Sequence, residues 1–197
     1  MAAPKMCIAQ HPEADALNAR DPLALLIGMV LDQQVPLEWA FLGPYTLTQR
    51  LGTDLDVEKL AAMDEAALVG VFCDRPAMHR YPAAMARRVH DLCNLIVSDY
   101  RSDPAAIWTT ATDGAELCKR VKSLPGFGDM KARIFVALLA KQFGVRPDGW
   151  EAVAGDYGTP DSYLSVADIV DAASLNKVRA YKAQKKAAAK AAAAAQS

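Results

Sequence analysis

The sequence has few cysteines, no long hydrophobic run and no alternating strand pattern, and each absence excludes a class of protein. The four cysteines among 197 residues have no C-x-x-C pair and no nearby histidine pattern; they are Cys7, Cys73, Cys93 and Cys118. They favour neither a disulfide framework, nor a zinc site, nor a cysteine-ligated iron–sulfur cluster. The longest strongly apolar run, ALLIGMVL at 24–31, is far shorter than the roughly 20 residues of a membrane span. The N-terminus has no apolar stretch fit for a secretory signal, so we expect a reduced, cytoplasmic protein without membrane association.

Acidic and basic residues nearly balance, but they are unevenly distributed. The chain has 22 Lys and Arg against 23 Asp and Glu, a formal net charge of −1. Six of the 22 basic residues and none of the acidic ones lie in the Lys/Ala-rich stretch 177–197, which leaves a body of 16 basic against 23 acidic residues. An acidic body argues against indiscriminate binding to a polyanion. Local basic surfaces remain at 75–90 and 119–133, although each run is equally consistent with a solvated helix face.

Helix signals dominate the chain. Asp21, followed by proline, has the cap-and-proline start of a helix, and the next residues are apolar nearly all round, which predicts a buried helix. Asp103 repeats this start, and Ser165 opens a Ser-x-x-Asp capping pattern. We predict an all-α protein with helices over 22–31, 57–72, 82–97, 113–122, 129–143 and 165–175. The stretch 177–197 has high helix propensity but no core-forming face, so we expect a mobile tail or a frayed helix.

The most informative motif is the short run Leu124-Pro125-Gly126-Phe127-Gly128, which lies between two helical patterns. Its proline ends the first helix, and its two glycines permit a tight hairpin and the close approach of another backbone. Amide N–H groups of such a turn and of the next helical turn point outward, an arrangement that suits a phosphate. An ordinary connection between two packed helices is the alternative that a G-x-G pattern leaves open.

Longer segments around this motif resemble a known family. Residues 117–144 (LCKRVKSLPGFGDMKARIFVALLAKQFG) resemble the helix-hairpin-helix of the base-excision DNA glycosylases, the endonuclease III-like (HhH-GPD) superfamily. Residues 21–36 (DPLALLIGMVLDQQVP) are similar to that superfamily's buried early helix and the glutamine-bearing loop that faces DNA. Residues 82–97 resemble the helix between these two marks, so that the resemblance covers roughly 21–150 of the chain.

The resemblance implies a two-lobed, all-α HhH-GPD fold. A central lobe would cover 21–134 and contain the hairpin at 124–128. A second lobe would combine 1–20 with 135–176, and the basic tail 177–197 would add salt-sensitive contacts to nucleic acid.

The resemblance also implies how this fold would bind DNA. The five hairpin residues would contact the DNA backbone, and Gln34 would fill the gap left by an extruded base, with Gln33 as a near substitute. The alternative for this pair is a polar helix end that bonds to its own backbone. Some family members have a nucleophilic lysine in the first turn after the hairpin, where this chain has Met130. Lys131, one residue later, would instead face a phosphate. Because the lysine nucleophile is missing, the resemblance implies a monofunctional glycosylase.

The catalytic aspartate of the family lies beyond the hairpin, at the start of the next helix, and Asp148 matches it when the sequences are counted without a gap. Asp148 and Glu151 also form an Asp-x-x-Glu capping box pattern, so a plain cap is the alternative role. The usual surroundings of the family's aspartate are replaced here by Arg-Pro-Asp-Gly. Asp156 is a second candidate for the carboxylate.

Three aromatic side chains suggest a base pocket. Trp39, Tyr45 and Trp150 could stack against a base, although a core role is the alternative for each. His79 and His90 lack metal-like spacing, and we expect them on a polar or basic face. We expect no metal site of side chains and no required cofactor. The resemblance implies that hairpin carbonyls hold a monovalent cation, Na⁺ or K⁺, and that no iron–sulfur cluster is present.

The expected partner is double-stranded DNA, bound by a monomer associated with the nucleoid. The expected reaction is hydrolysis of the N-glycosidic bond of a damaged or mismatched base. Two other hypotheses stay open at this point. One is a catalytically inactive module that binds damaged or distorted DNA, and the other is a helical scaffold whose hairpin packs against its own chain.

Overall fold

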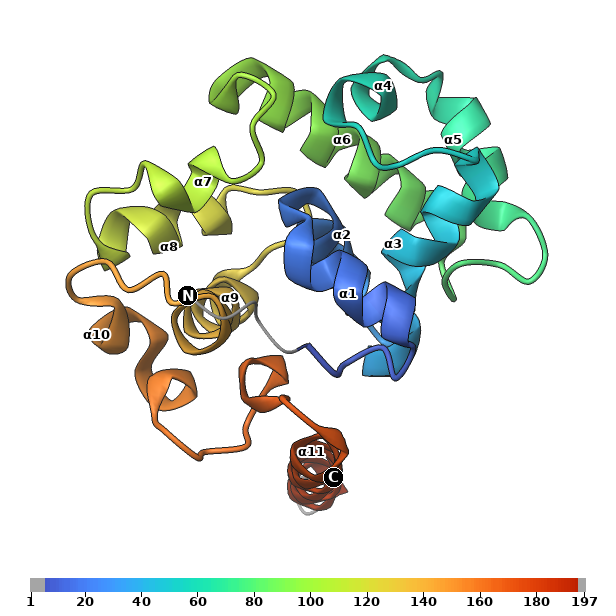
Figure 1. Ribbon diagram of the computed structural model, residues 1–197. Coiled ribbons are helices and arrows are strands. Elements are labelled where there is room, and N and C mark those ends of the chain that lie inside the picture. Colours follow the sequence, from blue (N-terminus) through green and yellow to red (C-terminus); the bar gives the residue numbers. More distant parts are fainter. Residues whose placement is uncertain (1–5, 195–197) are drawn as a thin grey trace.

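The computed structural model describes residues 6–194, and within them the chain is all-α, with no strand, as the sequence predicts (Figure 1). The elements are α1 (Pro12–Arg20), α2 (Pro22–Leu31), α3 (Leu37–Leu51), α4 (Val57–Ala62), α5 (Glu65–Cys73), α6 (Pro82–Tyr100), α7 (Ala106–Thr109), α8 (Gly114–Lys122), α9 (Asp129–Gln142), α10 (Trp150–Ala154), the 3₁₀ turns η1 (Gly155–Gly158) and η2 (Val166–Asp168), and α11 (Ala172–Ala194). No helix of the described part is long and apolar enough to cross a membrane.

Helix α2 lies at the centre of the molecule because it has no polar face. The Asp21 carboxylate accepts hydrogen bonds from the backbone N–H groups of Leu23 and Ala24, and Pro22 occupies the first turn, so the predicted start is confirmed. All residues from 23 to 31 are buried. Figure 1 shows α3 to α6 gathered on one side of α2 and α7 to α10 on the other. A helix that is apolar all round can bury its surface only between two such groups.

Two long helices carry the packing on either side of α2. On α6, the predicted stripe is buried throughout, with Met85, Val89, Leu92, Cys93 and Ile96 all in the core. On α9, the run 135–140 is completely buried, and α8, α10 and both 3₁₀ turns pack around it. The hairpin 124–128 joins α8 to α9, as the sequence predicts.

Three predicted helices have different boundaries in the structure. The expected helix over 57–72 is two helices, because Asp64 caps a new start by accepting a hydrogen bond from the Ala67 N–H. Asp103 bonds the Ala105 N–H, and α7 begins only after it. The capping box of Ser165 and Asp168 forms, but it opens the 3₁₀ turn η2 rather than the expected helix over 165–175.

The Lys/Ala-rich stretch continues α11, which begins at Ala172 and runs as one helix to Ala194. Leu175 and Val178 are buried against the body, and Arg179 forms an ion pair with Glu38 of α3. The boundary expected at 177 therefore falls inside an anchored helix. Residues 195–197 of the expected tail, like residues 1–5 of the expected second lobe, lie outside the described residues.

Candidate nucleic-acid interface

The hairpin is held in place by its two apolar residues. Leu124 and Phe127 are buried, and the ring of Phe127 packs edge-on against Phe135 at 5.8 Å between centroids. The Phe127 N–H donates to the Leu124 carbonyl at 3.0 Å, which closes the turn. Gly126 has a φ of +82°, in the region that favours glycine, so the sequence pattern matches the backbone that it must adopt.

The outer side of the hairpin presents free hydrogen-bond donors. Gly128 is exposed and is the N-cap of α9, with no side chain bonded to the helix end. Among the described residues, no acceptor bonds to the N–H groups of Gly126, Gly128 or Asp129. A Cβ atom added at Gly128 would meet nothing within 4 Å. The fold itself therefore does not require glycine at 128, and the missing side chain leaves this amide accessible from outside.

Charged side chains around the hairpin are partly neutralised. Lys122 lies 3.0 Å from the Asp129 carboxylate in an exposed ion pair. Asp129 stands in the first turn of α9, where its own charge already interacts with the positive end of the helix. Both members of this ion pair therefore stand close to the exposed hairpin amides.

The glutamine loop between α2 and α3 is bonded directly to the hairpin. Gln33 donates from Nε2 to the Gly126 carbonyl at 3.3 Å, and its Oε1 accepts from Arg88 Nη1 at 2.5 Å. Gln34 is exposed, adopts a positive φ of 57°, and accepts a hydrogen bond from the Tyr81 hydroxyl at 3.4 Å. Gln33 thus ties the loop to the hairpin and to α6, and Gln34 is the residue of the pair that is presented outward.

A buried histidine supports this loop from below. His79 Nε2 lies 3.1 Å from the carbonyls of both Leu31 and Gln33, while Nδ1 accepts from the Tyr81 N–H at 3.0 Å. Only a neutral ring protonated at Nε2 satisfies all three bonds. Burial also lowers the pKa of His79. Because the side chain is buried, the expectation that His79 lies on a polar or basic face is wrong.

Two exposed aromatic residues flank this histidine. Trp39 is 39% and Tyr81 43% exposed, each with its ring centroid about 6 Å from that of His79. The Arg80 guanidinium lies 5.4 Å from the centre of the Tyr81 ring. Sequence reasoning missed Arg80 and Tyr81 as a pair; the basic run at 75–90 was the available signal. His90 also deviates from expectation, because its Nε2 contacts two carbonyls at the end of α4.

Lys131 does not present its charge outward. Its Nζ donates to the Met29 carbonyl at 2.6 Å, near the end of α2, and lies 5.7 Å from the centre of the Phe127 ring. Burial lowers the pKa of Lys131 to about 8. The prediction that this ammonium faces a phosphate is therefore wrong, because it serves the C-terminal end of α2.

The predicted catalytic aspartate lies away from the hairpin. Asp148 is exposed, and its backbone carbonyl accepts from the N–H of Gly114, the first residue of α8. The hairpin follows the other end of that nine-residue helix, roughly 13 Å along its axis. The capping box with Glu151 is not formed either, since Gly149 is the N-cap of α10 without a side-chain bond. The second candidate, Asp156, is exposed. Its neighbour Tyr157 lines a cavity together with Met130 and Lys131, in the first turn of α9.

The three aromatic residues expected in a base pocket do not meet. Trp39 lies near the glutamine loop, whereas the Tyr45 ring packs on that of His11 at 4.9 Å. Trp150 lines a cavity of about 520 Å³ at the C-terminal end of α9, together with Arg146 and Tyr163. The expectation of one shared pocket is therefore wrong for these three residues.

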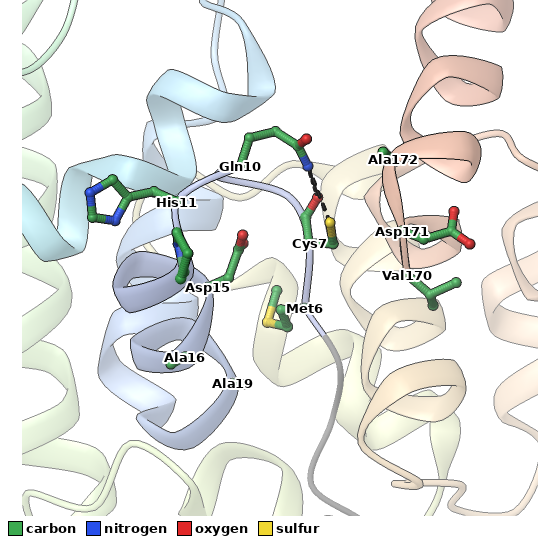
Figure 2. Close-up of a pocket in the computed structure, with 11 residues that line it drawn as sticks. Met6, Cys7, Gln10, His11, Asp15, Ala16, Ala19, Val170, Asp171 and Ala172 are labelled. Carbon is green, nitrogen blue, oxygen red and sulfur yellow. Dashed lines mark hydrogen bonds between the residues drawn. The ribbon is translucent and has the colours of Figure 1, made fainter.

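A larger hollow of about 600 Å³ lies between the N-terminal segment and the start of α11. Figure 2 shows the Gln10 amide bonded to the Cys7 carbonyl and sulfur across its rim. The carboxylate of Asp15 accepts from the N–H groups of Ile8 and Ala9 at 2.8 Å each. These polar groups hold the N-terminal segment in place, so they serve the fold rather than a ligand.

The described residues contain no group of three or more His, Cys, Asp or Glu side chains that could hold a metal ion. Comparison of the chain with protein-family models, with curated proteins and with solved structures finds no match. The candidate interface combines exposed hairpin amides, a glutamine loop bonded to the hairpin, and the exposed side chains of Trp39 and Tyr81 with Arg80 beside them.

Proposed function

We propose that this chain is a base-excision DNA repair protein of the helix-hairpin-helix type. It binds double-stranded DNA as a monomer and hydrolyses the N-glycosidic bond of a damaged or mismatched base. The observation that carries the proposal is the hairpin 124–128: its Gly128 and the following Asp129 expose amides that no other described residue accepts from, beside a glutamine loop that is bonded to the hairpin. The all-α arrangement around a buried α2 is consistent with the two-lobed HhH-GPD fold that we propose for it.

A phosphate of one strand binds at the N-terminus of α9, where amide donors and the helix dipole favour an anion. Gln34 enters the duplex next to this phosphate, and Tyr81 stacks on an exposed base. Arg80 and Lys122 supply flanking positive charge. The exposed lysines of α11 add nonspecific affinity, so binding should weaken steeply with salt.

The chemistry we propose needs no cofactor. Met130 replaces the family's lysine nucleophile, so a water attacks the sugar and a carboxylate stabilises the developing positive charge. A monovalent cation at the hairpin would share the carbonyls of Leu124 and Gly126 with the hydrogen bonds that they already accept. DNA binding through the amides does not depend on such an ion.

One observation favours a second candidate function, a catalytically inactive module that binds damaged or distorted DNA. Asp148, the residue at the matching position of the family's catalytic carboxylate, lies at the opposite end of α8 from the hairpin. If no other carboxylate replaces it, the interface can recognise distortion but cannot hydrolyse the bond.

A panel of duplexes, each with one damaged or mismatched base, tests the proposal. Incubation with the purified chain, followed by alkaline cleavage of abasic sites, reports base release, and fluorescence anisotropy on the same duplexes reports binding. Release from at least one lesion supports the glycosylase. Tight binding without release from any lesion supports the inactive module, and binding to no duplex refutes both.

A further inference from the structure

A small cavity of about 280 Å³ lies at the first turns of α9, the helix that follows the hairpin, and is closed by the end of α2, η1 and α11. We call it the Lys131 cavity; it is lined by Met29, Asp32, Met130, Lys131, Ile134, Tyr157, Leu164, Tyr181, Lys182 and Lys185. Its volume falls just below the roughly 300–1,000 Å³ that is typical of drug-sized ligands, so it suits one planar base rather than a whole nucleotide. Tyr157 and Tyr181 offer aromatic rings against which a base can stack.

The Lys131 cavity has one carboxylate among its lining residues, that of Asp32. This side chain is half-buried, and among the described residues it accepts no hydrogen bond and forms no ion pair within 4 Å. Its backbone N–H bonds the Gly28 carbonyl at 3.1 Å, so the position of Asp32 is fixed by the end of α2. Lys131, Lys182 and Lys185 line the same cavity, so the carboxylate shares this space with three basic side chains.

We infer that the base extruded from the duplex enters the Lys131 cavity and that Asp32 is the catalytic carboxylate. This inference rests on the glycosylase proposal and replaces Asp148 in it. Asp32 directly precedes the glutamine pair, one of which bonds the hairpin, so a carboxylate and the DNA-binding loop share one short segment. Asp148 has no such connection, because the whole of α8 separates it from the hairpin.

In the proposed reaction, the bond between the sugar C1′ and the base nitrogen breaks, and the departing base keeps the electron pair and takes a proton from solvent. The Asp32 carboxylate stabilises the positive charge on the sugar and accepts a proton from the attacking water, whose oxygen bonds to C1′. Asp32 then returns this proton to solvent, so the net change is the addition of one water across the bond.

The test compares Asp32→Asn with the matched control Asp148→Asn, an exposed carboxylate of similar chemistry. Neither side chain bonds to the protein in the part of the chain described, so both variants should fold, which thermal melting checks. Single-turnover base release from the active lesion should fall by about 100-fold or more for Asp32→Asn, as general-base loss predicts. Release by Asp148→Asn should stay within about threefold, and the Kd for the duplex should stay within about twofold for both.

Base release by Asp32→Asn at the wild-type rate would overturn the inference and leave the glycosylase proposal standing. Loss of release in Asp148→Asn alone would do the same. If the wild-type chain releases no base from any lesion, both the inference and the glycosylase proposal are refuted. A second readout is independent of release: 2-aminopurine fluorescence at the extruded position should rise on binding, and Leu164→Trp, which fills the cavity, should reduce the rise. An unchanged rise in that variant would also overturn the inference.

Discussion

Replacement of Gly128 by alanine separates the role of this residue in the fold from its role in binding. Gly128 has a φ of −106° and ψ of −179°, an extended backbone that any residue can adopt. Its added Cβ would meet nothing within 4 Å. Alanine is a poorer N-cap than glycine but restricts the unfolded chain, and these opposing effects should leave the free energy of unfolding within about 1 kcal/mol of wild type.

The same methyl group should weaken DNA binding, because it stands where a phosphate must approach the amide. Loss of one charge-assisted hydrogen bond to the backbone removes about 1.5–3 kcal/mol. This corresponds to an increase in Kd of about 10- to 150-fold. Fluorescence anisotropy with a labelled duplex at fixed salt measures the change, and urea denaturation of the same samples measures stability.

Two other glycines are controls for this experiment. Gly126→Ala should lose roughly 1–2 kcal/mol of stability, because its φ of +82° strains any L side chain. Gly70→Ala, at an exposed site inside α5 with nothing within 4 Å, should gain about 0.5–1 kcal/mol and bind DNA as wild type does. If Gly128→Ala is folded and binds the duplex with the wild-type Kd, the hairpin amides do not contact phosphate and the reasoning fails.

Three further predictions concern stability and reactivity. Gly114→Ala should destabilise the fold by about 1–3 kcal/mol in urea denaturation, because its Cβ would lie 2.7 Å from the backbone of Trp150, which cannot move aside. Unchanged stability would contradict the close packing of α8 on α10. Hydrogen bonds from Thr112 lower the pKa of Glu116 from 4.5 to about 2. The stability that this carboxylate contributes is therefore present above pH 4.5 and is lost as the pH falls through 2. Glu116→Gln should flatten the pH dependence of unfolding across that window, and an acid profile identical to that of wild type would refute the assignment. Burial raises the pKa of Cys93 to about 12, so a thiol reagent at pH 8 should modify Cys93 only after unfolding, and rapid labelling of the native protein at this site would show that the α6 core is open.

Local features of the fold follow from the sequence because their causes are local. Asp21 caps α2 through its own side chain, and the apolar residues after it leave no face that could meet water. The stripe on α6 is buried because its spacing puts those residues on one side of a helix. The bend at Gly126 forms where proline and glycine permit it.

The break at Asp64 and the short turn at Ser165 were within reach of the same local reasoning. Both residues are caps, and the sequence prediction placed one inside a helix and the other at the start of too long a helix. Length was misjudged because a capping box fixes where a helix begins but says nothing of where it ends.

The candidate interface depended on contacts between residues far apart in the chain. Lys131 was expected outside and lies against the end of α2, since the carbonyl it bonds belongs to a residue about one hundred positions earlier. His79 is buried because the loop that ends α2 crosses over it. Asp148 lies at the end of α8 that is far from the hairpin, because α10 packs there. Counting residues along the sequence does not give this spatial separation between Asp148 and the hairpin.

The sequence by itself determined the all-α class, the buried central helix and the position of the hairpin, because caps, periodicity and turn residues act within a few positions of one another. Tertiary structure alone decided which polar side chains reach the surface beside that hairpin and which are used inside. The physical reason is that a lysine, a histidine or an aspartate carries the same chemistry in either place, and its role is set by the carbonyls, rings and charges that distant segments bring to it.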